Sequence, residues 1–270
     1  MRIARGISVS NTSKPISTAI VYDTDAAAFF TAASITDNTQ KNAVNTLVLD
    51  LKSASIWTKM KALYPVVGGV ASAHAVNLKQ PGTYNLTFAT GWTHSSTGMT
   101  PNGATYANTN LKPAIDLAGK QNNTHLSYYS RTNNTGLYDI GHSWSLETSL
   151  IYLQARAADG KSYFRLNSQN AGGTESSQTV TDSLGLFTIN RTSSNVQSII
   201  KNSTKYNFNV NSFGLPNNDI FLALLFINPN YYYGNKQCAF ASIGDGLTDA
   251  EASSFYTAVQ NYQTTLGRQL

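Results

Sequence analysis

Short runs of apolar and alternating residues occupy the chain from residue 65 to residue 247 and predict β-strands. Runs of about four to eight residues that alternate apolar and polar side chains, or that are apolar throughout, fit half-buried or buried strands. We expect the clearest ones at Tyr84–Phe88, His125–Ser130, Leu137–Trp144, Ser149–Ala155, Ser162–Leu166, Leu184–Asn190, Val196–Ile200, Tyr206–Val210 and Ile220–Ile227. About ten to thirteen strands at such short spacing are typical of a two-sheet sandwich.

The stretch 23–64 carries the helical pattern instead. Asp23 or Thr24 can cap a first helix, and Thr36 or Asp37 can cap a second, because their side-chain oxygens accept from free backbone N–H groups. Apolar residues then recur at helical spacing at Val44, Leu47, Val48, Leu51, Ile56, Trp57, Met60 and Leu63. Pro65 ends the pattern, since proline cannot continue a helix.

The C-terminal stretch predicts one strand followed by one helix. The apolar run 238–243 has strand composition, and Gly244-Asp245-Gly246 then favours a tight turn. Thr248 and Glu251 form a T-x-x-E capping box that starts a helix, and Gly267 supplies its end. The helix has one apolar face, so we expect it to cover a sheet made by the preceding chain.

This ending resembles that of concanavalin A-like jelly-roll domains of the laminin-G type. The shared features are a last strand, a Gly/Asp turn, and an L-[ST]-x-x-E start to a helix with a tyrosine in its second turn. The longer string FASIGDGLTDAEASSFYTAVQNYQTTLGR is similar to a narrower set, virion proteins of tailed bacteriophages that carry such a jelly roll. The upstream strings NTLVLDLKSASIWTKMKALYPVVGG, GWTHSSTGMTPNG and THLSYYSRTN support it, so the resemblance spans roughly residues 25–270.

The resemblance implies a mainly β fold, a two-sheet antiparallel jelly-roll sandwich with N-terminal helices and one C-terminal helix. We divide the chain into an arm at 1–22, a helical segment packed on the sandwich at 23–64, the sandwich at 65–247, and the C-terminal helix of the same domain at 248–270. The implied function is that of a virion structural protein on the capsid surface, in a head fibre or near the tail. It would be assembled in the host cytoplasm and located in the virion.

The arm leaves two interpretations open. Ile3, Ile7 and Val9 lie on one side of a strand-like alternation, which Pro15 interrupts. The segment is either a frayed terminus or edge strand of its own domain, or a strand added to a neighbouring subunit. The second interpretation makes other virion proteins the partners of the arm, with a homo-oligomer as a further expectation.

Composition narrows the partners and the compartment. Charged residues are only 12% of the chain, about half the usual share, and the net charge of +5 is spread along it, so we expect no nucleic-acid partner. The single Cys238 excludes a disulfide framework and favours assembly in a reducing compartment. The start lacks the apolar core of a signal peptide, and no stretch has the length of a membrane span.

Catalysis is not expected. Glycoside hydrolysis needs two carboxylates at a defined separation. Of the three glutamates, Glu251 belongs to the capping box, Glu175 lies in a polar loop, and Glu147 has no acid two or four residues away. No G-x-S-x-G motif occurs either. We therefore predict that the protein is not an enzyme.

No metal or other cofactor is expected, with one weak exception. The histidines at 74, 94, 125 and 142 lack the spacing of metal ligands. Asp245, between two glycines, could hold Ca²⁺ through its carboxylate and nearby carbonyls. The turn already accounts for that aspartate, so calcium is the weaker interpretation.

Sugar binding is the better functional candidate, because lectin sites stack an aromatic ring on the apolar face of a sugar and surround it with polar groups. Several aromatic residues lie in polar, loop-like stretches, among them Tyr106 and Trp144. The candidate glycan contacts are Trp92, His94, Tyr128, Arg131, Tyr231, Tyr232 and Tyr233. Three consecutive tyrosines cannot all face inward, so the run 231–233 should expose at least one ring.

Three functions remain open on this basis. The first is the virion protein, whose outward loops would contact host glycans. The second is a carbohydrate-binding module of a cellular protein, with glycan affinity as its main activity. The third and weakest is a polysaccharide-degrading enzyme.

Overall fold

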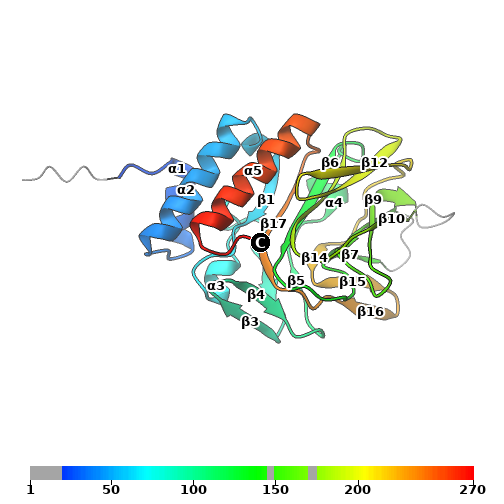
Figure 1. The fold of residues 1–270 in the computed structure, drawn as a ribbon, viewed down its shortest axis with the longest axis horizontal. Coiled ribbons are helices and arrows are strands. Elements are labelled where there is room, and N and C mark those ends of the chain that lie inside the picture. The colour runs from blue at the N-terminus through cyan, green and yellow to red at the C-terminus, as the bar shows by residue number, and fades with distance from the viewer. Residues whose placement is uncertain (1–19, 145–148, 170–174) are drawn as a thin grey trace, which may run out of the picture.

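The computed structural model describes residues 20–144, 149–169 and 175–270, which form two antiparallel sheets and a layer of helices (Figure 1). The predicted arm lies outside the described residues except for its last three positions. The mainly β sandwich with N-terminal helices and one C-terminal helix is therefore confirmed.

The first sheet, sheet A, has eight described strands. Its order is β13-β12-β11-β6-β17-β4-β3, with β1 also paired to β17. The strands are β1 (Met60–Tyr64), β3 (Trp92–Ser95), β4 (Gly98–Pro101), β6 (Thr124–Ser130), β11 (Gly185–Arg191), β12 (Val196–Lys201), β13 (Thr204–Asn209) and β17 (Cys238–Gly244).

The second sheet, sheet B, has nine described strands. Its order is β10-β9-β8-β7-β14-β5-β2, and the hairpin β15–β16 joins it through a parallel pairing of β15 with β7. The strands are β2 (Thr87–Phe88), β5 (Ala107–Asn108), β7 (Ile140–Trp144), β8 (Ser149–Gln154), β9 (Lys161–Gln169), β10 (Ser176–Thr179), β14 (Ile220–Leu222), β15 (Leu224–Ile227) and β16 (Asn230–Tyr233).

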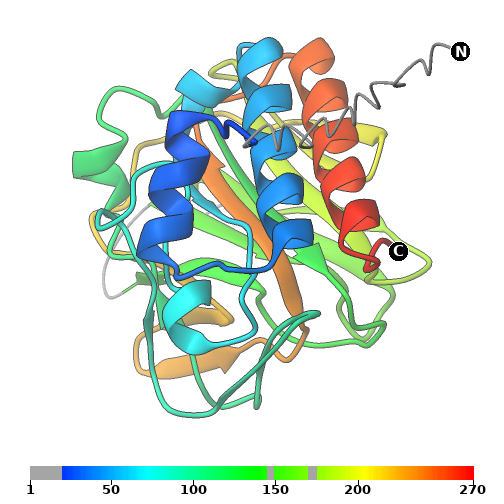
Figure 2. The same cartoon turned by 90° about the vertical axis from the view of Figure 1, so that its left-hand side faces the viewer.

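Helices cover the outer face of sheet A. The helices α1 (Thr24–Ala32), α2 (Asn38–Ser53) and α5 (Asp249–Thr265) lie side by side across it (Figure 2). Their apolar residues form one core with side chains of sheet A, such as Tyr129, Leu186 and Phe240. Two short helices, α3 (Ala71–His74) and α4 (Pro113–Asp116), lie in the connections.

A second core fills the space between the two sheets. It contains Leu126 and Phe187 of sheet A, and Ile151 and Phe164 of sheet B. Sheet A is therefore buried on both faces, whereas the outer face of sheet B has no helix layer among the described residues. This difference leaves the outer face of sheet B as the part of the sandwich that can meet a ligand.

The predicted helix starts are confirmed. The Asp23 carboxylate accepts from the backbone N–H of Asp25, and that of Asp37 accepts from Gln40. Thr248 and Glu251 make both hydrogen bonds of the capping box. Capping is set by residues within one turn, so the local sequence suffices to predict it.

Three expectations need correction. Met60 and Leu63 do not continue a helix: after a short 3₁₀ turn at Trp57–Lys59, Met60–Tyr64 pairs with β17 as strand β1. The run 220–227 is not one strand, because Ala223 adopts a positive φ of 59° and divides it into β14 and β15. The polar loop expected around Glu175, between the predicted strands 162–166 and 184–190, is partly strand, since β9 extends to Gln169 and Ser176–Thr179 forms β10.

Candidate functional site

The hairpin β15–β16 lies across the outer face of sheet B. Its strand pairing sets Leu224 opposite Tyr233, and Phe226 opposite Tyr231. The crossing is close at Gly141 of β7, where an added Cβ would lie 2.9 Å from the carbonyl oxygen of Leu224. Only a residue without a side chain lets the hairpin approach the sheet this closely.

One side of the hairpin packs down onto the sheet. Leu225 forms a small core with Leu150 and Tyr152, and Ile227 and Tyr232 pack against it. The ring of Tyr138 fills the space between them, with its centroid 4.9 Å from that of Tyr152 and 6.0 Å from that of Tyr232. This apolar contact fixes which face of the hairpin remains outside.

The other side of the hairpin presents aromatic rings to solvent. Phe226 and Tyr231 have ring centroids 4.4 Å apart, and the rings of Tyr231 and Tyr233 are parallel within 5°, with centroids 5.8 Å apart. Tyr231 is 55% exposed, the largest exposed fraction of any described tyrosine. Two parallel rings in a row offer a continuous apolar surface with hydroxyl groups at its rim.

The aromatic surface continues onto the neighbouring strands. Tyr106, next to β5, and Phe221 of β14 have ring centroids 5.4 Å apart. The backbone N–H of Gly234, next to Tyr233, donates to the carbonyl of Ala223 over 2.9 Å, so the end of the hairpin adjoins the end of β14. Partial burial, and after it the nearby hydroxyls of Tyr231 and Tyr106, raise the pKa of Tyr233. We call these five residues, Tyr106, Phe221, Phe226, Tyr231 and Tyr233, the aromatic strip.

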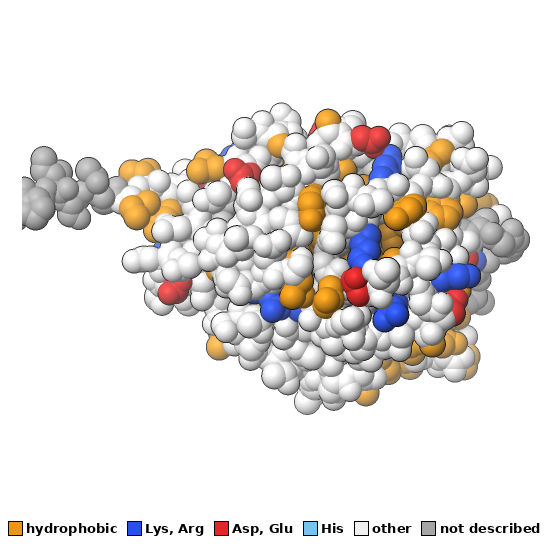
Figure 3. Space-filling model, viewed as in Figure 1, with side chains coloured by type: hydrophobic (Ala, Val, Ile, Leu, Met, Phe, Trp, Pro, Cys, Tyr) orange, Lys and Arg blue, Asp and Glu red, His pale blue; other side chains and the backbone are white. Residues whose placement is uncertain are grey.

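The aromatic strip stands out on a surface with few charges. Figure 3 shows one face of the molecule, which is mostly neither charged nor hydrophobic. Hydrophobic side chains gather at its lower right edge, where Figure 1 places β15 and β16. Exposed apolar patches on a single chain often mark binding surfaces.

A carboxylate and an amide lie beside the aromatic strip. The side-chain N–H of Asn108 donates to Oδ2 of Asp219 over 2.9 Å. Asn108 and Phe221 are directly paired across β5 and β14. Sites for small polar ligands combine such apolar surfaces with a few fixed polar groups.

The predicted tyrosine run is divided by the structure. Tyr231 and Tyr233 belong to the aromatic strip, whereas Tyr232 turns inward onto Tyr138. Tyr128 is a wrong prediction, because its side chain is completely buried between the sheets and its hydroxyl donates to the carbonyl of Lys236. Burial on both faces of sheet A explains the error.

The other predicted contacts lie elsewhere. The indole N–H of Trp92 donates to the backbone carbonyl of Tyr106 over 3.0 Å, and its ring contacts Phe88. His94 places its Nδ1 2.9 Å from Nδ1 of His74. The guanidinium of Arg131 donates to the carbonyl of Arg268 in the C-terminal tail. None of these three side chains extends the aromatic strip.

Phe221 and Phe226 were missed by sequence reasoning. Both lie in the apolar run 220–227, which predicted one fully buried strand. Phe221 points outward by the alternation of β14, since Ile220 and Leu222 on either side of it face the core. The positive φ of Ala223 then restarts the alternation in β15, and nothing in the run other than its length marks that division. Tyr106, in contrast, showed the polar surroundings that single out an exposed aromatic residue.

Two carboxylates away from the strip form salt bridges with lysines. The Asp139 carboxylate lies 3.3 Å from the ammonium of Lys236, and that of Asp245 lies 2.7 Å from Lys120. The predicted calcium ligand Asp245 is thus paired with Lys120 through its Oδ2 atom. Across the described ranges, no three His, Cys, Asp or Glu side chains converge as a metal site would require.

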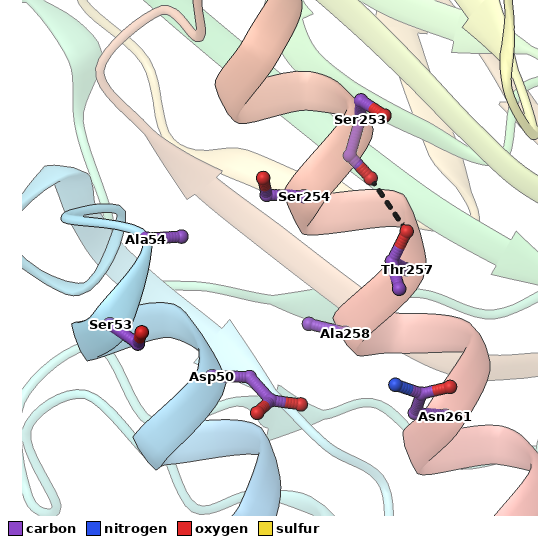
Figure 4. A pocket seen from close by; sticks show the side chains of 8 residues that line it. All are labelled: Asp50, Ser53, Ala54, Ser253, Ser254, Thr257, Ala258 and Asn261. Atoms are coloured by element: carbon purple, nitrogen blue, oxygen red, sulfur yellow. Dashed lines mark hydrogen bonds between the residues drawn. The ribbon is translucent and has the colours of Figure 1, made fainter.

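A polar groove separates α2 and α5 on the opposite side of sheet A. It has a volume of about 480 Å³ and is lined by Asp50, Ser53, Ala54, Ser253, Ser254, Thr257, Ala258 and Asn261. Asp50 and Asn261 point toward each other across it (Figure 4). Since no aromatic ring lines this groove, it lacks the apolar surface that stacking on a sugar requires.

Comparisons with known proteins establish the fold class. No protein-family model matches the sequence, and neither does any curated protein. A Trypanosoma rangeli sialidase mutant displaying trans-sialidase activity matches with a TM-score of 0.51 and 8% identity, over 83% of this chain and 39% of that one. In the described part of the chain, no helix has the length and apolar character needed to cross a membrane.

The binding domain of botulinum neurotoxin DC matches in two complexes. The complex with rat synaptotagmin II gives a TM-score of 0.53, and the complex with SialylT gives 0.54. Each has 12% identity and covers 76% of this chain and 52% of the other. The chain thus spans about half of these proteins or less, and the likeness shows a shared β-sandwich fold.

Proposed function

We propose that this protein is a non-catalytic, carbohydrate-binding β-sandwich domain that binds sugar on the aromatic strip. The observation that carries the proposal is the gathering of five partly exposed aromatic rings on the one sandwich face that helices leave uncovered. The similar fold of a toxin domain in complex with SialylT and that of a sialidase support it by analogy.

The absence of catalysis is part of the proposal. A glycosidase needs two carboxyl groups that face one bond. Asp139 is buried with Lys236, and Glu251 is held by Lys59 and by the N-terminus of α5. Neither can approach a sugar on the aromatic strip, and Asp219, the carboxylate that lies beside the strip, has no second carboxylate within the strip or the Asn108–Asp219 pair.

The biological setting is a second part of the proposal. The resemblance to phage virion proteins favours a structural protein of the virion, on the capsid surface or near the tail. Other virion proteins would bind the arm at 1–22, and the aromatic strip would contact host glycans. The alternative is a carbohydrate-binding module of a cellular protein, which uses the same strip and needs no arm.

A glycan array followed by isothermal titration calorimetry tests the binding. We expect Tyr231→Ala to weaken sugar binding about tenfold or more, because it removes the most exposed ring of the strip. Phe213→Ala is the matched control, since Phe213 is 51% exposed but has no ring contact with the strip. Equal affinities of the two variants would contradict the proposed site.

The polar groove provides a second control. Asp50→Ala alters the groove between α2 and α5 without touching the aromatic strip. Wild-type affinity in this variant supports the strip. A loss of binding in Asp50→Ala, with Tyr231→Ala unaffected, would move the site to the groove.

A separate experiment distinguishes the virion protein from the cellular carbohydrate-binding module. Particles that co-purify with the chain would be imaged by electron cryomicroscopy, and a chain lacking residues 1–22 would be tested for incorporation. Density on a capsid or tail, lost with the truncated chain, supports the virion role. A free monomer that still binds sugar would favour the cellular module.

A further inference from the structure

The polar pair beside the aromatic strip is positioned by strand alternation. Successive side chains of a strand point to opposite faces, so residues two apart share a face. Tyr106 and Asn108 therefore point to the same side of β5, as do Asp219 and Phe221 at the start of β14. The ring contact of Tyr106 with Phe221 and the hydrogen bond of Asn108 with Asp219 bear this out.

The hydrogen bonds leave the carboxylate partly available. Oδ2 of Asp219 accepts from Asn108, and Oδ1 of Asn108 accepts from the backbone N–H of Asn110 over 2.7 Å. Asn108 is thus held in one orientation by its neighbours. A carboxylate accepts about four hydrogen bonds, so Asp219 can accept more from a ligand placed over Phe221.

The aromatic strip and the Asn108–Asp219 pair contain one charged side chain. Among the residues of the aromatic strip and the Asn108–Asp219 pair, none is a lysine or an arginine, and Asp219 carries the one formal charge. Recognition of a carboxylate, sulfate or phosphate on a sugar relies on arginine or lysine donors. An anionic sugar placed here would meet a like charge.

We infer that the site takes a neutral sugar, whose apolar face lies on Phe221 and Tyr106 while its hydroxyl groups donate to Asp219. The inference rests on the proposed function and makes it more specific. Hydroxyl groups are donors that a carboxylate satisfies well, and hydrogen bonds to a charged acceptor are stronger than those between neutral groups. A neutral sugar would then differ from SialylT, the ligand in the complex of the toxin domain with a similar fold.

The test uses pairs of sugars that differ by one charged residue. Lactose is compared with 3′- and 6′-sialyllactose, and a panel of neutral tetrasaccharides (cellotetraose, maltotetraose, xylotetraose, mannotetraose) is compared with sulfated and uronic-acid oligomers. Wild type, Tyr231→Ala and Asp219→Asn are titrated at about 50 mM and about 500 mM NaCl, because salt screens a charged contact. Thermal melting confirms that each variant is folded.

We expect neutral sugars to bind, with little dependence on salt and with dependence on Tyr231. Asp219→Asn keeps the shape but removes the charge, and we expect it to lower affinity for the bound neutral sugar about tenfold. Unchanged affinity in Asp219→Asn would overturn the role of this carboxylate.

Different results would contradict the neutral-sugar specificity and the carbohydrate-binding function. Binding of sialylated or sulfated sugars alone, lost in Tyr231→Ala, would overturn the neutral specificity and leave the carbohydrate-binding function standing. Binding of no sugar in either panel by the wild type would overturn the function itself.

Discussion

Lys236 donates a hydrogen bond to Asp139 over 3.3 Å, and both side chains are completely buried. The other carboxylate oxygen of Asp139 accepts from the backbone N–H of Ala155 over 2.7 Å. Burial raises the pKa of Asp139, and the charge of Lys236 opposes that rise. The pair joins the start of β7 to the segment before β17, so it links sheet B to sheet A.

Removing one member of this pair is expected to be costly. Lys236→Met leaves the Asp139 carboxylate buried without its ammonium, and we expect a loss of about 3–5 kcal/mol in the free energy of unfolding. The double variant Lys236→Met/Asp139→Leu removes both charges and should be more stable than the single variant. Urea denaturation measures the free energy of unfolding of both variants. A double variant less stable than the single one would contradict the cost assigned to the unpaired carboxylate of Asp139.

Acid is expected to destabilise the fold through buried histidines. Burial lowers the pKa of His125 to about 4 and that of His142 to about 4, whereas the unfolded chain titrates near 6.5. Below pH 6.5 the unfolded state therefore binds more protons than the folded state, and stability falls until the pH reaches about 4. We expect each histidine to lower the free energy of unfolding by about 2 kcal/mol at pH 5, relative to neutral pH.

Urea denaturation at pH 7.5, 6, 5 and 4 measures this loss. His125→Gln and His142→Gln should each flatten the pH dependence, because glutamine does not titrate. A curve of the wild type that stays level between pH 7 and pH 4 would contradict the neutral, buried state of both histidines.

The hairpin that carries the aromatic strip is expected to depend on Gly141. Gly141→Val would force side-chain atoms against the carbonyl of Leu224 and against Tyr152, and overpacking of this kind costs about 1–3 kcal/mol. We expect the hairpin to shift while the sandwich stays folded. Sugar affinity, measured by calorimetry below the melting temperature, should then fall.

Gly214→Val is the matched control for this variant. An added Cβ at Gly214 meets no atom within 4 Å, and the residue has no positive φ. It should retain wild-type affinity. If Gly141→Val binds sugar as tightly as Gly214→Val does, the hairpin is not positioned by this contact.

The sequence predicts the features that depend on neighbouring residues. The caps of α1, α2 and α5 need only side chains within a turn of the helix start, and all three follow from the residue types. The fold class follows in the same way, from many short strands and a helix with one apolar face.

The candidate site could be predicted only in part, because exposure depends on what covers each sheet. Every residue of β6, Thr124–Ser130, is buried, since helices cover one face of sheet A and sheet B covers the other. Alternation along β6 therefore did not reveal that Tyr128 is inaccessible. Phe221 and Phe226 were hidden by the opposite error, because the apolar run was taken as buried on both faces, whereas Phe221 lies on the outer face of β14 and the division at Ala223 resets the alternation before Phe226.

The buried guanidinium of Arg268 makes most of the hydrogen bonds that hold the C-terminal tail, beside those of Arg131 and Tyr129. Arg268 is 2% exposed, and its guanidinium donates to the carbonyls of Pro65, Val66 and Ala239 over 2.7–2.9 Å. Its Nε–H donates to the side chain of Gln263. These bonds tie the end of α5 to β17 and to the segment after β1.

Replacing this arginine is expected to destabilise the helix layer without changing the site. In Arg268→Lys a compact ammonium cannot reproduce the planar fork of donors that reaches Gln263 and three separate carbonyls at once, and each unsatisfied carbonyl costs about 1–3 kcal/mol. We therefore expect Arg268→Lys to lower the free energy of unfolding by about 3 kcal/mol, and Gln269→Ala, at the exposed neighbour, to leave it unchanged. Sugar affinity should match the wild type in both, since the tail lies beyond sheet A from the aromatic strip. Full stability in Arg268→Lys would show that the charge alone, and not the fork of donors, holds the tail.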